Sequence, residues 1–368
     1  MKKLIVLSVV FALVATAAFA VDIGANVFGL VIPAQGGSGQ EWDNDAGAMV
    51  DLPSEVYSDL SFQRVRFSGY GEAGDGAFGG QMRIEGTSVI GLKDAFAFWK
   101  PIDQLKVLIG ANSDGFYGKE GVTGWGFNGN PYDGGVAFGG GNIWGWGPYN
   151  KGDIKYRDAF YGGYGANALQ LNITPVDMFT LNIAIPFEGG VETADVFKSV
   201  MVQADVNLDF GNIALTFQAA DDAGQVWVYY GGSFGDLSLD VGFSYNMDEN
   251  AQPVGIGAGL KYATDAFGVK FRVVANLGGD KLGTNVMAEV LPYFSLGDNI
   301  AAFVSIGICT KIPDSGDSVF DWHFNPYIRI GEEWGAQFLV GVQVYTSGGG
   351  GSDGYTKWAI PIAIMLMF

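Results

Sequence analysis

The chain has very little of several residue types on which common protein classes depend. Of its 368 residues, only Cys309 is a cysteine and only His323 is a histidine. No disulfide can therefore form within the chain, and a Ser-His or Asp-His site would have to be built on His323 alone. A P-loop is missing, and the glycine pairs lie in predicted loops rather than between a strand and a helix. We expect no enzymatic function and no cofactor.

Long apolar runs and basic residues are also scarce. After residue 20 there is no stretch of about 18 uninterrupted apolar residues, which excludes membrane-spanning helices. The 20 Lys and Arg residues against 39 Asp and Glu residues give a net charge of -19. Because no basic run follows the amino-terminal segment, nucleic-acid binding is excluded.

Residues 1–20 have the pattern of a secretory signal peptide. Two lysines precede an apolar run over residues 4–14, and the small-residue site Ala18-Phe19-Ala20 stands before Val21. The pattern predicts export, cleavage near Val21 and a mature chain of one domain over residues 21–368.

The rest of the chain alternates between polar and apolar residues. It is 48% hydrophobic and 14% aromatic without a spanning helix, so its apolar side chains must be hidden by alternation. In GVKFRVVAN, for example, Val269, Phe271 and Val273 oppose Lys270 and Arg272. Runs of about ten such residues suit a strand that crosses a bilayer at a tilt. The pattern predicts an all-β, transmembrane antiparallel β-barrel, apolar outside and polar inside.

The connections between these runs alternate in length. Eight short turns and nine longer segments give 18 strands, or 16 if one hairpin is merged. Short periplasmic turns and longer external loops are typical of such barrels. The longer segments include Pro33–Leu60 and Asn112–Tyr156. Residues 112–156 are the predicted third external loop.

The last residues read WAIPIAIMLMF, in which every second residue from Trp358 to Phe368 is apolar and faces one way. Both faces are apolar near the end, which no solvated edge strand tolerates. This segment resembles the closing strand of bacterial outer-membrane barrels. The resemblance implies that Phe368 is read by the outer-membrane assembly machinery.

With the signal peptide, alternation and terminal Phe together, the mature chain resembles a Gram-negative-type outer-membrane porin. The stretch FWKPIDQLKVLIGANSDGFYG looks like spirochaete outer-membrane porins. The resemblance implies a protein in the cell outer membrane, in contact with outer-membrane lipid, that lets small hydrophilic solutes or ions diffuse passively. It implies a homotrimer, with a monomer as the alternative.

Alternation places more basic than acidic side chains on the predicted inner face. The cations are Arg64, Arg66, Arg83, Lys106, Lys261, Lys270, Arg272, Arg329 and Lys357, against Glu85, Asp205, Asp240 and Glu289. A basic lumen favours anions, because fixed charge in a narrow pore shifts the local ion concentration. We expect Lys106 to lie near Arg64 and Arg66. The other interpretation is that the cations only pair with acids of neighbouring loops.

The third external loop is rich in glycine and aromatic residues. If it folds inward as a constriction loop, its rings can stack on sugars while its acids bind hydroxyls; the residues concerned are Trp125, Phe127, Tyr132, Trp144, Trp146, Glu120 and Asp133. Alternatively the rings pack against the wall or a neighbouring subunit. The Asp-Asn-Asp segment at residues 43–45 lacks the distant Glu of an EF-hand, so we expect no metal site.

Two functions other than a diffusion channel are open on the sequence. One is a surface adhesin or structural barrel with a plugged lumen, in which the external loops bind ligands. The other is a transporter of hydrophobic solutes, which would need an amino-terminal plug; Val21–Ile32 reads as a strand and leaves little for one.

Overall fold

The computed structural model describes residues 20–43, 48–51, 56–86, 90–111, 167–186, 196–220, 223–247, 254–278, 283–312, 318–332, 335–349 and 352–367. Nearly all of them are strand. The predicted signal peptide lies outside these ranges, except that Ala20 begins the first strand. Over the described ranges, no helix is long and apolar enough to cross a membrane.

The elements follow one another along the chain almost without interruption by other structure. A single short helix among the described residues, η1 (Val196–Ser199), precedes β9. The strands are β1 (Ala20–Asp43), β2 (Ala48–Asp51), β3 (Tyr57–Ala73), β4 (Phe78–Gly86), β5 (Ile90–Ile102), β6 (Leu105–Ala111), β7 (Asn167–Val176), β8 (Phe179–Pro186), β9 (Met201–Leu208), β10 (Gly211–Ala220), β11 (Ala223–Phe234), β12 (Leu237–Asn246), β13 (Val254–Ala263), β14 (Phe267–Leu277), β15 (Thr284–Gly297), β16 (Ile300–Ile312), β17 (Val319–Gly331), β18 (Gln337–Gly341), β19 (Gln343–Gly349) and β20 (Ser352–Met367).

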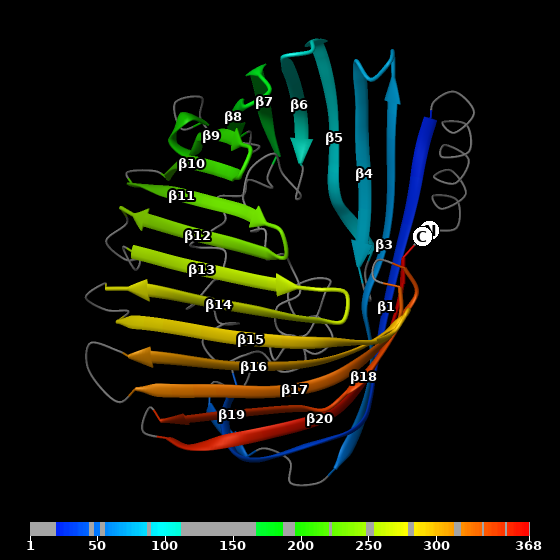
Figure 1. Ribbon diagram of the computed structural model, residues 1–368, viewed down its shortest axis with the longest axis vertical. Helices are drawn as coiled ribbons and strands as arrows, with labels where there is room; N and C mark the ends of the chain where they lie inside the picture. Colours follow the sequence, from blue (N-terminus) through cyan, green and yellow to red (C-terminus); the bar gives the residue numbers. More distant parts are fainter. Residues whose placement is uncertain are drawn as a thin grey trace.

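These strands form one closed antiparallel barrel (Figure 1). Strands that follow one another pair, and β20 closes the sheet by pairing with β1 from Asn26↔Met367 to Gly39↔Tyr355. Strand β2 is a short arm paired with the far end of β1. Strands β18 and β19 together fill one place between β17 and β20. The wall therefore has 18 strands, which confirms the predicted fold and decides between 16 and 18.

The connections differ at the two ends of the barrel, as predicted. The eight connections at one end, here called the turn end, have two to five residues each, whereas most of those at the opposite loop end are longer. Strand β1 begins and β20 ends at the turn end. One predicted loop is wrong: most of Pro33–Leu60 is strand, because β1 continues to Asp43 and β3 begins at Tyr57.

A turn between β11 and β12 shows how the sequence sets the hairpins. Gly235 and Asp236 form the whole connection, and Gly235 has φ 61°. A two-residue turn that follows the twist of the flanking strands needs left-handed backbone, which glycine adopts without the clash of a Cβ.

The outer face carries exposed apolar side chains, with aromatic rings near the turn end. Phe78 and Trp99 stack with their ring centroids 6.5 Å apart and are 54% and 48% exposed. Rings at this depth suit a membrane-water interface. Two rings that also stand close to turns in the sequence lie elsewhere: Phe98 is 4% exposed and faces inward, and Tyr293 stacks inside on Phe303. Adjacent residues of a strand point to opposite faces, so Phe98 cannot share the outward face of Trp99.

Four prolines stand in the middle of long wall strands, on β1, β15, β17 and β20, and three of them coincide with breaks in pairing, whereas Pro101 and Pro175 lie next to the ends of β5 and β7. The register between β1 and β20 shifts between Val31 and Ala34, where Pro33 faces the region of Pro361. Opposite Pro326 the partner strand is split into β18 and β19 at Val342. Proline has no backbone N–H, so each removes one bond from the ladder. We call this line of Pro33, Pro292, Pro326 and Pro361 the proline seam.

Placing a charge on the outer face should destabilise the barrel. Phe271 is 43% exposed in the middle of β14, so Phe271→Arg should cost about 2–4 kcal/mol near the bilayer midplane. The adjacent inward substitution Lys270→Gln is the control and should cost much less. Urea unfolding in lipid vesicles measures both, and equal losses would contradict the assignment of faces.

Candidate functional site

The inner face of the barrel is the candidate site, and strand β12 shows how it is built. Val241, Phe243 and Tyr245 are 44%, 41% and 44% exposed, whereas Asp240 and Ser244, at the alternate positions, are buried. Because side chains alternate along a strand, the apolar set points outward and the polar set inward. The same alternation runs through neighbouring strands in continuous register.

The cations singled out from the sequence occupy inward positions of this alternation. Those whose side chains are described lie next to exposed outward residues and are themselves partly or fully buried: Arg66, Arg83, Lys106, Lys261, Lys270, Arg329 and Lys357. Arg64 and Arg272 share the same face by register. Arg64, which pairs with Phe28, stands two residues before Arg66 on β3. Arg272 pairs with the buried Glu289. Register fixes their positions on the sheet and leaves their role in a pore as a proposal.

The expected group of Arg64, Arg66 and Lys106 is not formed. Arg66 forms an ion pair with Glu85 on the adjacent strand β4. Lys106 lies at the turn end, where its Nζ stands 3.9 Å from the centroid of the Phe98 ring. Alternation fixes the face on which a side chain lies but not its height along the barrel, and this is why the sequence misplaced Lys106.

Three other cations do come together, on β13 and β14. Lys261 pairs directly with Lys270, and Arg272 stands one inward position further along β14 from Lys270. On the other side of β14, Arg272 pairs in register with Glu289 of β15, which is 2% exposed. This group is called the basic cluster below.

The inner face carries more acids than the sequence predicted. Asp321 is fully buried on β17, and Glu72 on β3 accepts a hydrogen bond from the Tyr70 hydroxyl. The alternation of Asp321 with Trp322 would have shown it, whereas Glu72 in GYGEAGDG resembles a turn residue. The inner face is therefore less one-sidedly basic than nine cations against four acids.

A row of polar side chains crosses β7 to β10. Asn172 donates from Nδ2 to Asn182 Oδ1 at 2.7 Å, and Thr216 donates from Oγ1 to Gln203 Oε1 at 3.0 Å. Asn182 and Gln203 both donate to Asp205 Oδ2, at 3.3 Å and 2.7 Å. We call these five residues the amide row. Three of the four links join neighbouring strands, and the fourth, from Gln203 to Asp205, lies within β9. The row could not be predicted from the sequence because it depends on the register of four strands.

His323 has a serine partner on the adjacent strand. Its Nε2 lies 2.8 Å from Ser305 Oγ on β16, and both side chains are buried. The run Gly231–Gly235 matches the letters of a nucleophile elbow. Its Ser233 lies in β11, contacts Ser238 at 3.0 Å and has no helix after it, so the match has no structural support.

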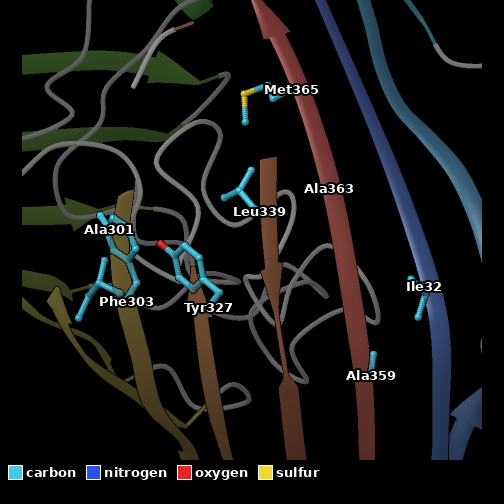
Figure 2. Packing of buried hydrophobic residues seen from close by; sticks show 9 residues of the cluster. Ile32, Ala301, Phe303, Tyr327, Leu339, Ala359, Ala363 and Met365 are labelled. Carbon is cyan, nitrogen blue, oxygen red and sulfur yellow. The ribbon is translucent and has the colours of Figure 1, made fainter. Parts of the chain in front are cut away.

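Part of the inner face is apolar, contrary to the predicted polar lining. Figure 2 shows the packed side chains, in which the rings of Phe303 and Tyr327 stack with centroids 4.7 Å apart. Arg329 lies over Phe303 with its guanidinium carbon 5.2 Å from the ring centroid. This apolar lining comprises Ile32, Leu291, Ala301, Phe303, Tyr327, Leu339, Ala359, Ala363 and Met365.

The other predicted site residues lie outside the described part of the chain. They are Glu120, Trp125, Phe127, Tyr132, Asp133, Trp144, Trp146 and Phe368. Of the segment Asp43-Asn44-Asp45, Asp43 ends β1, and Asn44 and Asp45 are also outside the described residues. Where the structure is described, no group of three His, Cys, Asp or Glu side chains could hold a metal ion.

Comparison with known proteins identifies relatives in structure alone. No family model and no curated protein matches the sequence. Two solved structures from Pseudomonas aeruginosa are similar. OpdL has a TM-score of 0.56 at 10% identity, over 95% of this chain and 99% of its own. OpdQ has a TM-score of 0.56 at 8% identity, over 95% and 98%. A variant of the Rh. blastica porin reaches 0.48 at 13% identity, over 94% and 100%. At these identities the likeness to OpdL and OpdQ shows the outer-membrane barrel fold.

The Arg66–Glu85 ion pair should contribute measurably to stability. Glu85→Gln leaves a partly buried guanidinium without its charged acceptor, so we expect a loss of about 1.5 kcal/mol, the lower end for hydrogen bonds to charged groups. The double variant Arg66→Gln/Glu85→Gln should recover part of that loss, because no unpaired charge remains. Urea unfolding of the single and double variants tests this, and strictly additive losses would contradict it.

Proposed function

We propose that this protein is an outer-membrane porin that allows passive diffusion of small hydrophilic solutes or ions. The observation that carries the proposal is the closed wall of 18 strands, apolar outside and mostly polar or charged inside. Barrels of 16 to 18 strands leave room for an aqueous channel, whereas those of eight are filled by their own side chains.

The proposed route to the membrane rests on the two ends of the chain. The signal-peptide pattern of residues 1–20 supports export, and Phe368 after strand β20 is the proposed signal for the assembly machinery. Outer-membrane lipid then contacts the exposed apolar face. A homotrimer is the proposed assembly, and the resemblance to spirochaete porins remains part of this proposal.

We propose further that the lumen prefers anions. The basic cluster supports this, because Lys261, Lys270 and Arg272 concentrate positive charge at one height of the wall. The other proposed pore-lining cations are Arg64, Arg66, Arg83, Lys106 and Arg329. The ion pair of Arg66 with Glu85 offsets part of their charge, so the basic cluster is the sharper place to test selectivity.

Replacing the basic cluster should move the ion selectivity toward cations. In the triple variant Lys261→Gln/Lys270→Gln/Arg272→Gln, the reversal potential in a salt gradient across a planar bilayer should shift in that direction. The shift should shrink as salt rises, since charges are screened over about 10 Å at 0.1 M. Ser244→Ala, an uncharged change on the same face, should leave selectivity unaltered. A wild-type channel that already prefers cations at low salt would contradict the proposal.

The constriction loop is also a proposal. The described strands β6 and β7, which pair with each other, bracket residues 112–166. The aromatic and acidic residues of this segment, Glu120 to Trp146, are the proposed contacts with solutes.

Shortening this segment should widen the pore. Deletion of residues 121–146 should raise the single-channel conductance, because a constriction dominates the resistance of a pore. Deletion of the Asp-Asn-Asp segment at residues 43–45, at the same end of the barrel, is the control and should not. Unchanged conductance in the first variant would mean that the segment stays outside the lumen.

One observation favours the alternative of a structural or adhesive barrel with a plugged lumen. Asp321, His323 and Gln343 on the inner wall have no exposed area, which an open water-filled lumen would not give. Ion conductance in planar bilayers separates the two functions, since a permanently plugged barrel carries no current.

A further inference from the structure

The inner wall is divided into two sectors of different chemistry. Strands β7 to β12, the green and yellow-green strands of Figure 1, contain no lysine or arginine. All the proposed lining cations lie on β3 to β6 and β13 to β20. Amides and hydroxyls occupy the uncharged sector, and its inward acids are Asp205 and Asp240.

Gln170, on β7 within this sector, is unusual. It has no exposed area, and within the described part of the chain neither its Nε2 nor its Oε1 has a hydrogen-bond partner. It stands between Leu108 and Ala184 in register, one inward position from Asn172. Buried amides are nearly always bonded, and those that are not usually mark the place of a water or a ligand.

The amide row beside Gln170 has hydrogen-bonding capacity left over. Asn172 and Asn182 each donate one hydrogen bond from a group that has two N–H donors. Asp205 accepts hydrogen bonds from two amide N–H groups, which partly neutralise its negative charge. The six strands of this sector therefore offer fixed donors and acceptors and no lysine or arginine, and the one described cation between β8 and β9 is Lys198 of η1.

A hydroxyl group matches this set best, because one hydroxyl both donates and accepts. Gln170 offers a donor and an acceptor together, and a solute with several neighbouring hydroxyls can engage it and the amide row at once. Trp227 on β11 pairs in register with Thr216 on β10. The face of its ring suits the C–H side of a sugar.

We propose that Gln170 and the amide row form a binding track for neutral polyhydroxylated solutes, the class of sugars and polyols. The inference rests on the proposed diffusion channel and names a solute class for one sector of its wall. It assigns anion preference and hydroxyl recognition to different strands.

The test uses the full-length protein in planar bilayers with KCl. Glucose is the probe, and triethylene glycol dimethyl ether, whose ether oxygens only accept hydrogen bonds and which has no hydroxyl, corrects for viscosity. Glucose should reduce the current in a saturable way. Gln170→Leu breaks no hydrogen bond of the wall and should fold, yet it should raise the half-blocking concentration about tenfold, as expected for the loss of one good interaction. Gln343→Leu is the matched control, since Gln343 is also a buried amide without partners, on β19.

Each outcome decides between the possibilities. Block by glucose that weakens in Gln170→Leu but not in Gln343→Leu supports the track. Ion current without glucose block, or block that both variants weaken equally, overturns the track and leaves the channel intact. If no current flows, the channel proposal fails, and calorimetric titration of glucose into the detergent-solubilised protein tests the track alone. Absence of heat in the wild type then overturns it.

Discussion

Closure of the backbone hydrogen-bond ladder is the constraint on which the rest of this structure depends. In the hydrocarbon core each unpaired N–H or C=O costs several kcal/mol, so a sheet can enter a bilayer only without edges. Here the closing pair is β1 and β20, joined from Asn26↔Met367 to Gly39↔Tyr355. Because the chain has one cysteine, no cross-link within it can take over this role. In the closed wall, successive side chains point to the outer and the inner face in turn, and the alternating polarity of the sequence makes the two faces differ in polarity.

The fold could be predicted because each of its signals is local. The outward face of β20 is apolar in the sequence and exposed in the structure, as Ile360 and Ile364 show. The turns can be recognised in the sequence by residues such as Gly235. The face of a side chain is harder to predict where two candidates stand side by side: Phe98 and Trp99 are both aromatic and close to a turn, and only the parity of the strand decides which one points outward.

The site was harder to predict because it depends on relations between strands. Lys106 has the expected face but lies at the height of Phe98, far along the wall from Arg66. Asn182 and Gln203 are unremarkable in their own strands and become neighbours only through the register of β8 with β9. A single sequence gives the length of a hairpin approximately, whereas a row across four strands requires every register in between.

The proline seam changes what holds one side of the wall together. A hydrogen-bonded ladder is directional and resists sliding of one strand on the next, whereas contacts between apolar side chains are not directional. Along the seam the ladder loses donors, and Ile32, Leu291 and Tyr327 of the apolar lining stand directly beside Pro33, Pro292 and Pro326. Cohesion at this level of β1, β15, β17 and β20 therefore depends more on packing of the lining than it does in the strands β9 to β14, which contain no proline.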